Sequence, residues 1–210
     1  MFRTLTRRNL RAALLALPVA AGLLGAAAPA QAASAPPAGS LTCQGKGIDS
    51  AAKLHHRTET FIKAPLSTVW RLHTDVESWP RWQKPVTSMK RLDPGRLHPG
   101  SQFRWTTPAP ATPSTPATTL VITSTVHQAK PGQCIRWSGP AIGQGLRIDK
   151  GTHVWNFVPV RGGVIVRTEE SWTGQQLEAD AATAIKYLAP GLDLWLADLK
   201  AAAESRPCHH

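Results

Sequence analysis

Hydrophobic residues recur at every second position over much of the chain after residue 53, and this period is typical of β-strands. The first expected strand covers 54–62, with Leu54 and Ile62 on the same face. Five later segments alternate in the same way, around 103–105, 120–126, 135–137, 153–157 and 164–172. Because polar and apolar residues alternate in each segment, we expect one antiparallel sheet with one buried face.

Helical spacing replaces the period of two on either side of this series of strands. The sequence predicts a short helix that starts near Ser67 and a second helical turn over 75–82, which Pro80 interrupts. From about residue 178, apolar residues recur at intervals of three and four: Ile185, Leu188, Leu192, Trp195, Leu196 and Leu199. This pattern predicts a long amphipathic helix, with a kink at Pro190 and Gly191.

The first 32 residues have the pattern of a signal peptide. A basic start is followed by an apolar stretch at 12–25, which is too short to span a bilayer. Ala30-Gln31-Ala32 has the small-x-small pattern of a cleavage site, so we expect a mature, secreted protein that starts at Ala33 and has no transmembrane segment. The segment 6–10 is similar to a twin-arginine export motif, and an ordinary secretory signal is the open alternative.

The remaining chain divides into a linker, one domain and a tail. Residues 33–51 are rich in Ala, Pro, Gly and Ser and predict a flexible linker, residues 52–205 form the expected domain, and 206–210 form the tail. Three cysteines remain after export, Cys43, Cys134 and Cys208. Their odd number predicts one disulfide and one thiol, or no intramolecular bond, and the sequence leaves the three pairings open.

Composition narrows the range of functions. Hydrophobic residues make up 42% of the chain and charged residues 18%, as in a globular protein. Eight tryptophans indicate a dense core or a ligand cavity. The net charge is +11, but basic residues are scattered and no nucleic-acid motif accompanies them, so no nucleic acid is expected as partner. The sequence has no metal-ligand spacing and no glycine-rich phosphate loop, so no metal or cofactor is expected.

Six motifs occur in order over about 52–205, at 65–70, 75–82, 100–105, 131–137, 153–157 and 162–172. With their order of strands and helices they resemble the START-like superfamily, in particular its SRPBCC branch labelled polyketide cyclase/dehydrase. The resemblance implies an α+β helix-grip fold, a curved antiparallel sheet of about six strands around a long C-terminal helix, with two short helices after the first strand. It also implies an internal cavity for a hydrophobic or aromatic small molecule or a lipid.

The inward faces of the strands and of the long helix supply the candidate cavity. The residues expected to line it are Thr58, Thr60, Phe103, Trp105, Ile122, Ser124, Trp137, Trp155, Phe157, Thr168, Trp172, Leu188 and Trp195. His153 and Glu170 lie on adjacent strands of one hairpin and are expected to be cross-strand neighbours.

Two functions follow from this site. The favoured hypothesis is a secreted, monomeric protein that binds a hydrophobic small molecule or lipid. The alternative is a cyclase or dehydratase in which Glu170 orients His153 as an acid/base catalyst. The same two residues have a simpler explanation, a contact within the core or one that fixes the polar end of a ligand.

Overall fold

The structure is a computed structural model that describes residues 39–206; the predicted signal peptide and residues 207–210 of the tail lie outside the described residues. Seven strands alternate with a few helices along this part of the chain. The elements are β1 (Leu54–Ile62), α1 (Leu66–Thr74), the 3₁₀ helix η1 (Val76–Arg81), β2 (Ser88–Arg91), β3 (Gln102–Ala109), β4 (Thr118–Lys130), β5 (Cys134–Gly143), β6 (Leu146–Val160), β7 (Gly163–Thr173), α2 (Gln175–Glu178) and α3 (Ala181–Glu204). No helix among the described residues has the length and apolar character needed to cross a membrane.

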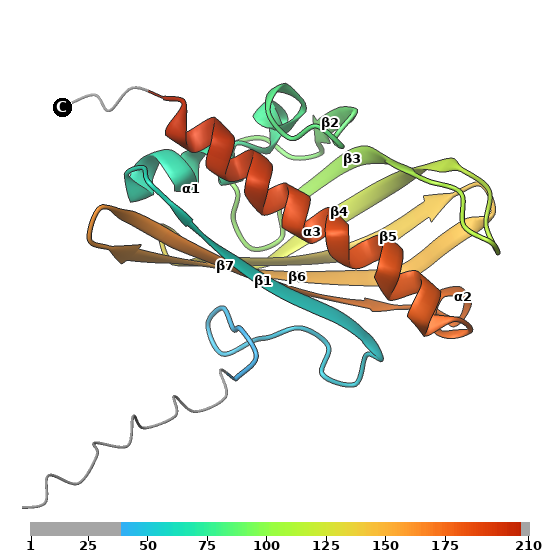
Figure 1. The fold of residues 1–210 in the computed structure, drawn as a ribbon. Helices are drawn as coiled ribbons and strands as arrows, with labels where there is room; N and C mark the ends of the chain where they lie inside the picture. The colour runs from blue at the N-terminus through green and yellow to red at the C-terminus, as the bar shows by residue number, and fades with distance from the viewer. Residues whose placement is uncertain (1–38, 207–210) are drawn as a thin grey trace, which may run out of the picture. The chain divides into compact units, whose positions relative to one another are not determined.

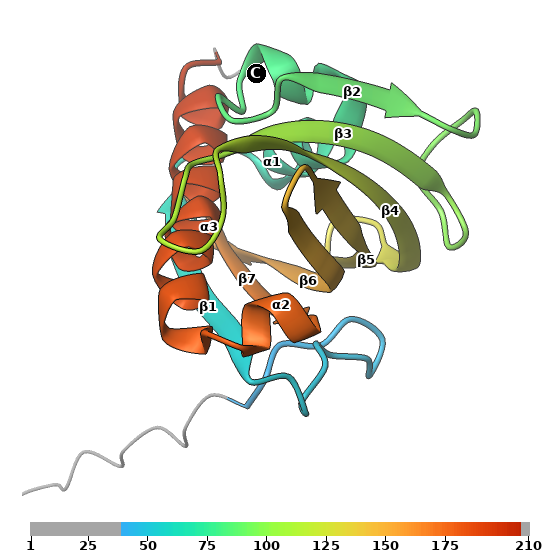
Figure 2. The ribbon, with the colours of Figure 1, turned by 90° about the vertical axis from the view of Figure 1, so that its right-hand side faces the viewer.

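The strands form a single antiparallel sheet in the order β1-β7-β6-β5-β4-β3-β2. The sheet curves around α3, which lies across its open side (Figures 1 and 2). The expected helix-grip fold is therefore confirmed. The sequence pattern missed β2, because its four residues, which pair with Phe103–Thr106 of β3, are too few to show an alternation.

Two irregularities accompany the curvature of the sheet. The register between β4 and β5 shifts at Val126/Gln128, and the register between β5 and β6 shifts at Gly139/Ala141. Such bulges bend a strand and increase its twist. A side chain at Gly139 would overlap the backbone carbonyl of Thr123, so only glycine allows β4 and β5 to approach this closely.

Helix α3 starts at a capping residue and buries one apolar stripe. The Oδ1 atom of Asp180 accepts a hydrogen bond of 3.1 Å from the backbone N–H of Thr183, the usual arrangement at a helix N-cap. The helix continues without a break through Pro190 and Gly191. Its buried residues are Leu192, Trp195, Leu196, Leu199 and Ala203, and they lie against the concave face of the sheet.

Helices α1 and η1 fill one half of that concave face. Trp79 of η1 is fully buried and packs edge-to-face against Phe103, with 5.5 Å between the ring centroids. Trp70 of α1 packs in the same way against Phe157, at 5.1 Å. These two contacts join the short helices to the sheet, and the half of the sheet beneath them is solid core.

The N-terminal segment 40–51, expected to be a flexible linker, packs against the outer face of the sheet. A disulfide joins Cys43 to Cys134 at the start of β5, which selects one of the three pairings left open by the sequence. Leu41 and Val154 are buried beside this disulfide. The buried carboxylate of Glu169 accepts hydrogen bonds from the backbone N–H of Leu41, at 2.5 Å, and from the Ser40 hydroxyl. We call residues 40–51 the N-terminal strap.

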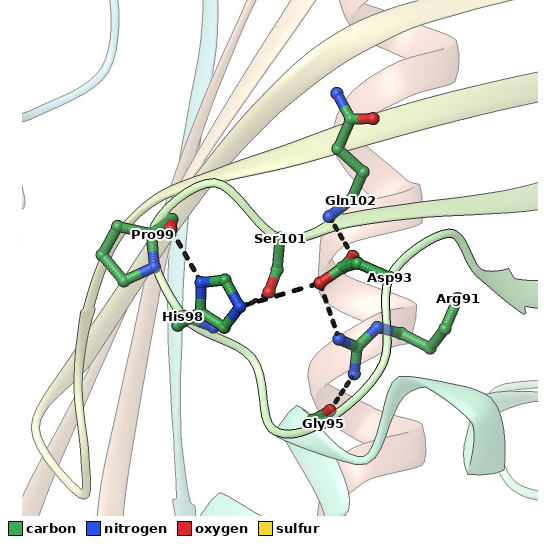
Figure 3. A network of polar contacts seen from close by, with 7 residues as sticks. All are labelled: Arg91, Asp93, Gly95, His98, Pro99, Ser101 and Gln102. Atoms are coloured by element: carbon green, nitrogen blue, oxygen red, sulfur yellow. Dashed lines mark hydrogen bonds and ion pairs between the residues drawn. The ribbon is translucent and has the colours of Figure 1, made fainter.

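A polar network holds the turn between β2 and β3 (Figure 3). The carboxylate of Asp93 accepts a hydrogen bond of 2.6 Å from the backbone N–H of Gln102 and one of 3.1 Å from Arg91. Arg91 also donates to the carbonyl of Gly95. These hydrogen bonds, led by that from Gln102, lower the pKa of Asp93, so its carboxylate pairs as an anion with the Arg91 guanidinium.

Candidate functional site

A cavity of about 230 Å³ lies between the sheet and the N-terminal half of α3, in the half of the concave face that α1 and η1 leave free. Strands β3 to β7 supply one wall and α2 and α3 supply the other. Most of the lining is apolar, and its largest hydrophobic side chains are Trp105, Leu120, Ile122, Leu146, Ile148, Trp172, Leu177, Leu188, Leu192 and Trp195. A concave, mostly apolar wall that carries some polar groups is the usual form of a small-molecule site.

About half of the residues predicted from the sequence lie at this cavity. Those that line it are Trp105, Ile122, His153, Glu170, Trp172, Leu188 and Trp195. The other predicted residues do not: Thr58, Thr60, Phe103, Ser124, Trp137, Trp155, Phe157 and Thr168. Most of this second group is buried in the core beneath α1 and η1, while Thr58 and Thr60 are half-buried on β1, the strand that packs beside α3. Alternation identifies the inner face of a strand, but it cannot tell which part of that face the short helices cover.

His153 and Glu170 form the most polar contact in the wall of the cavity. They lie opposite one another on β6 and β7, and the Nε2 atom of His153 is 2.7 Å from Oε1 of Glu170. Both residues are buried, with 9% and 7% of their surface exposed. A side chain on Gly151 would come within 3.2 Å of the same carboxylate oxygen, so the glycine leaves room for the pair. The Nδ1 atom of His153 is buried without a hydrogen-bond partner.

The rim of the cavity is built from a loop and from the start of α3. Pro110, Thr112 and Ser114 of the β3–β4 loop line the cavity, as does Tyr187 of α3. Within the loop, the hydroxyl of Thr112 accepts a hydrogen bond of 3.0 Å from the backbone N–H of Thr115. This loop lies at the end of the sheet away from α1 (Figure 1), and its residues line the cavity together with those of α3. Tyr187 is 38% exposed, so its side chain is shared between the cavity and the solvent.

His73, which no sequence pattern singled out as a site residue, lies in the core next to this site. The imidazole is fully buried among aromatic rings, 4.3 Å from the ring of Trp155 and 5.3 Å from that of Trp137. Burial, and to a lesser extent the charge of His153, lower the pKa of His73 to about 3. Neither ring nitrogen has a hydrogen-bond partner, so His73 is a neutral aromatic component of the core.

We expect His73 to make the protein sensitive to mild acid. The unfolded chain binds a proton at this imidazole near pH 6.5, whereas the folded chain does so only near pH 3, so stability falls as the pH decreases through this interval. Between pH 6 and pH 5 the free energy of unfolding should decrease by about 1.2 kcal/mol from this group alone. Urea unfolding of the wild type and of His73→Phe at both pH values measures the effect. An equal decrease in the two proteins would assign the acid sensitivity to other groups.

Gln83 is a second cavity residue that sequence reasoning missed. It follows η1, is only 1% exposed and lines the same cavity as Trp105 and Trp195. The Nε2 and Oε1 atoms of its side chain are both buried without a hydrogen-bond partner. Because no periodic pattern covers the irregular segment 82–87, pattern alone could not place a buried amide there.

Metal-ligating side chains do not gather at this site. Over residues 39–206, no group of three or more His, Cys, Asp or Glu side chains lies close enough together to hold a metal ion. The chemistry that the cavity wall itself offers is hydrogen bonding and proton transfer by His153 and Glu170, together with the unpartnered polar atoms of Gln83 and Trp195.

Comparison with known proteins gives the same picture of the fold. Residues 53–204 match the family described as "Polyketide cyclase / dehydrase and lipid transport". No curated protein matches the sequence.

Solved structures similar to this chain come from several bacteria. The protein TTHA0849 from Thermus thermophilus is 19% identical to this chain. The match covers 71% of this chain and 97% of TTHA0849, with a TM-score of 0.55. The hypothetical protein jhp0584 from Helicobacter pylori is 15% identical over 74% of this chain and 91% of its own, with a TM-score of 0.55. A protein from Rhizobium leguminosarum is 18% identical over 73% of this chain and 95% of its own chain, with a TM-score of 0.52. At these identities the likeness concerns the fold alone.

Proposed function

Because the chain belongs to the polyketide cyclase / dehydrase and lipid transport family, we propose that it is an exported carrier of a compact, largely apolar small molecule, bound in the cavity beneath α3. The observation that carries the proposal is the cavity itself, which lies between α3 and the sheet and is walled by tryptophan, leucine and isoleucine side chains. Burial of apolar surface contributes about 25 cal/mol per Å² removed from water, so such a wall favours an apolar ligand.

The size of the cavity supports a small ligand. Its volume of about 230 Å³ lies below the ~300–1,000 Å³ typical of sites for drug-sized molecules. The aromatic core beneath α1 and η1 leaves no room to extend the cavity in that direction, because Trp79, Trp137 and Trp155 fill it. A molecule of one to three rings fits this description better than an extended lipid chain.

Export has two independent supports. The first 32 residues combine a basic start, an apolar stretch and a small-x-small cleavage site. The Cys43–Cys134 disulfide is typical of proteins that fold in an oxidising compartment. On this proposal the protein acts outside the cytoplasm, and it collects or carries its ligand there.

Native mass spectrometry of protein secreted by its own host tests the proposal. We expect a mass that starts at Ala33 and a bound small molecule that is released unchanged on denaturation. The variant Leu188→Trp, which places a large ring in the cavity wall, serves as the control and should be secreted without the ligand. Secreted wild-type protein that carries no ligand and binds no apolar compound in solution would refute the carrier function.

The contact between His153 and Glu170 favours one second candidate, a cyclase or dehydratase. A buried carboxylate 2.7 Å from an imidazole orients it for proton transfer to or from a ligand in the same cavity. Under this alternative the bound molecule is converted on incubation, and Glu170→Gln lowers the rate by about 10²–10⁴-fold. Under the carrier proposal neither protein converts it.

A further inference from the structure

The wall of the cavity holds polar atoms that the protein itself leaves without partners. Gln83 and Trp195 both line the cavity, and both contact Trp79: the backbone N–H of Gln83 donates a hydrogen bond of 2.7 Å to the carbonyl of Trp79, whose ring packs against that of Trp195. Three of their atoms, Nε2 and Oε1 of Gln83 and Nε1 of Trp195, are buried and make no hydrogen bond. Trp195 also packs edge-to-face on Trp79, at 4.8 Å, and on Trp105, at 5.4 Å, so its ring is held firmly in place.

Buried polar groups in folded proteins almost always have a partner. An amide carries two donor hydrogens and one acceptor oxygen, and an indole N–H is a donor only. Two side chains that line the same cavity therefore offer unpaired hydrogen-bonding atoms: one acceptor, the amide oxygen of Gln83, and the N–H donors of Gln83 and Trp195. A hydroxyl group matches it, because the same oxygen can accept from an N–H and donate its hydrogen to the amide oxygen.

The charges around the cavity exclude an anionic group at this position. No lysine or arginine is among the described residues that line the cavity. The acidic residues that line it are Glu170 and Asp180, which caps α3, and the imidazole of His153, the one group among the described lining residues that can become a cation, is already paired with Glu170. A buried carboxylate or phosphate on the ligand would thus be desolvated without a cation to offset the cost.

We propose that Gln83 and Trp195 form a subsite for a neutral hydroxyl group, and that the ligand is a compact ring compound with this hydroxyl at its buried end. The inference rests on the proposed function, since it names the class of molecule that the carrier binds. The subsite uses other residues than the His153–Glu170 contact, whose facing atoms are already paired with each other. Ring and hydroxyl have separate roles, because the apolar wall supplies affinity and the subsite selects the hydroxylated compound.

Naphthalene and 2-naphthol are suitable probes, since they share one ring system and differ by one hydroxyl. Isothermal titration calorimetry at neutral pH gives the affinity of each compound for the full mature protein. We expect the wild type to bind 2-naphthol about tenfold more tightly than naphthalene, the ratio that one well-made buried hydrogen bond supplies. In Gln83→Met, which keeps the length of the side chain and removes its polar atoms, the ratio should fall to about twofold or less.

Two further variants separate the subsite from general effects. Trp195→Phe removes the indole donor and keeps an aromatic ring, so it should reduce the ratio while naphthalene still binds. Gln102→Met is the matched control: Gln102 lies on β3 outside the residues that line the cavity, and its side chain donates a hydrogen bond to the hydroxyl of Thr125. The control should keep the tenfold ratio.

The remaining outcomes overturn the inference in distinguishable ways. If the wild type binds naphthalene and 2-naphthol equally, the carrier function stands, and water rather than a ligand satisfies Gln83. If the preference persists in Gln83→Met and disappears in Glu170→Gln, the hydroxyl is recognised at the His153–Glu170 contact instead. If neither compound binds the wild type while other apolar ligands do, the hydroxyl subsite is refuted and the carrier function stands. If no apolar compound binds, the carrier function is refuted with it.

Discussion

Replacement of Cys43 and Cys134 by serine should lower the free energy of unfolding by about 4–5 kcal/mol. The disulfide joins residues 91 positions apart, and closing a loop of this length in the unfolded chain removes a large conformational entropy. The loss also frees the N-terminal strap, whose Leu41 and Cys43 are buried against the sheet. Chemical denaturation of the mature protein, in wild type and double variant, measures the difference.

The experiment is best done in a Cys208→Ser background, which removes the third thiol and prevents exchange. Cys208→Ser alone should leave the stability unchanged, and reduction of this protein should reproduce the effect of the double variant. A loss below about 1 kcal/mol would mean that the unfolded chain stays compact when the disulfide is absent, so that the bond restricts little.

His153→Leu should destabilise the protein by about 3–5 kcal/mol, because it leaves the Glu170 carboxylate buried without its partner. The double variant His153→Leu/Glu170→Leu should recover most of this loss. A pair of well-packed apolar residues often replaces a buried ion pair at little cost, and these two leucines would extend an already apolar wall. Thermal and urea unfolding of the three proteins give the coupling between the two sites.

Contrary results are equally informative. If the single variant loses less than about 1 kcal/mol, water in the cavity hydrates Glu170, and the contact is not a desolvated one. If the double variant is no more stable than the single variant, the cost comes from changed packing around His153 rather than from the unpaired carboxylate.

The sequence identified most of the fold because its signals are local. Alternation located six of the seven strands, and the three-and-four spacing located α3, since each signal depends only on which face of one element is buried. The register that places His153 opposite Glu170 was also predictable, because a short turn links their strands. β2 was not predicted, because its four residues are too few to show an alternation of polar and apolar positions.

The cavity could be predicted only in part, because its limits depend on how separate elements pack. Trp137 and Trp155 face inward as expected, yet His73 of α1 stacks on them and makes them core. Gln83 reaches the cavity from an irregular segment whose path is set by η1 and β2. The order of the strap was not predicted for a related reason. Its composition is that of a linker, and only the disulfide and the hydrogen bonds to Glu169 show that it is ordered.

The strap also sets where the folding unit begins. The family match starts at residue 53, after the whole strap, so a boundary drawn from the family would discard it. A chain shortened to that boundary would keep all seven strands of the sheet and the helices α1, η1, α2 and α3. It would nevertheless leave Cys134 as a thiol and expose Val154 and the carboxylate of Glu169, all three of which are buried in the intact chain. The minimal chain for expression therefore starts at Gly39 or earlier, which adds an outer layer to the domain that the family shares.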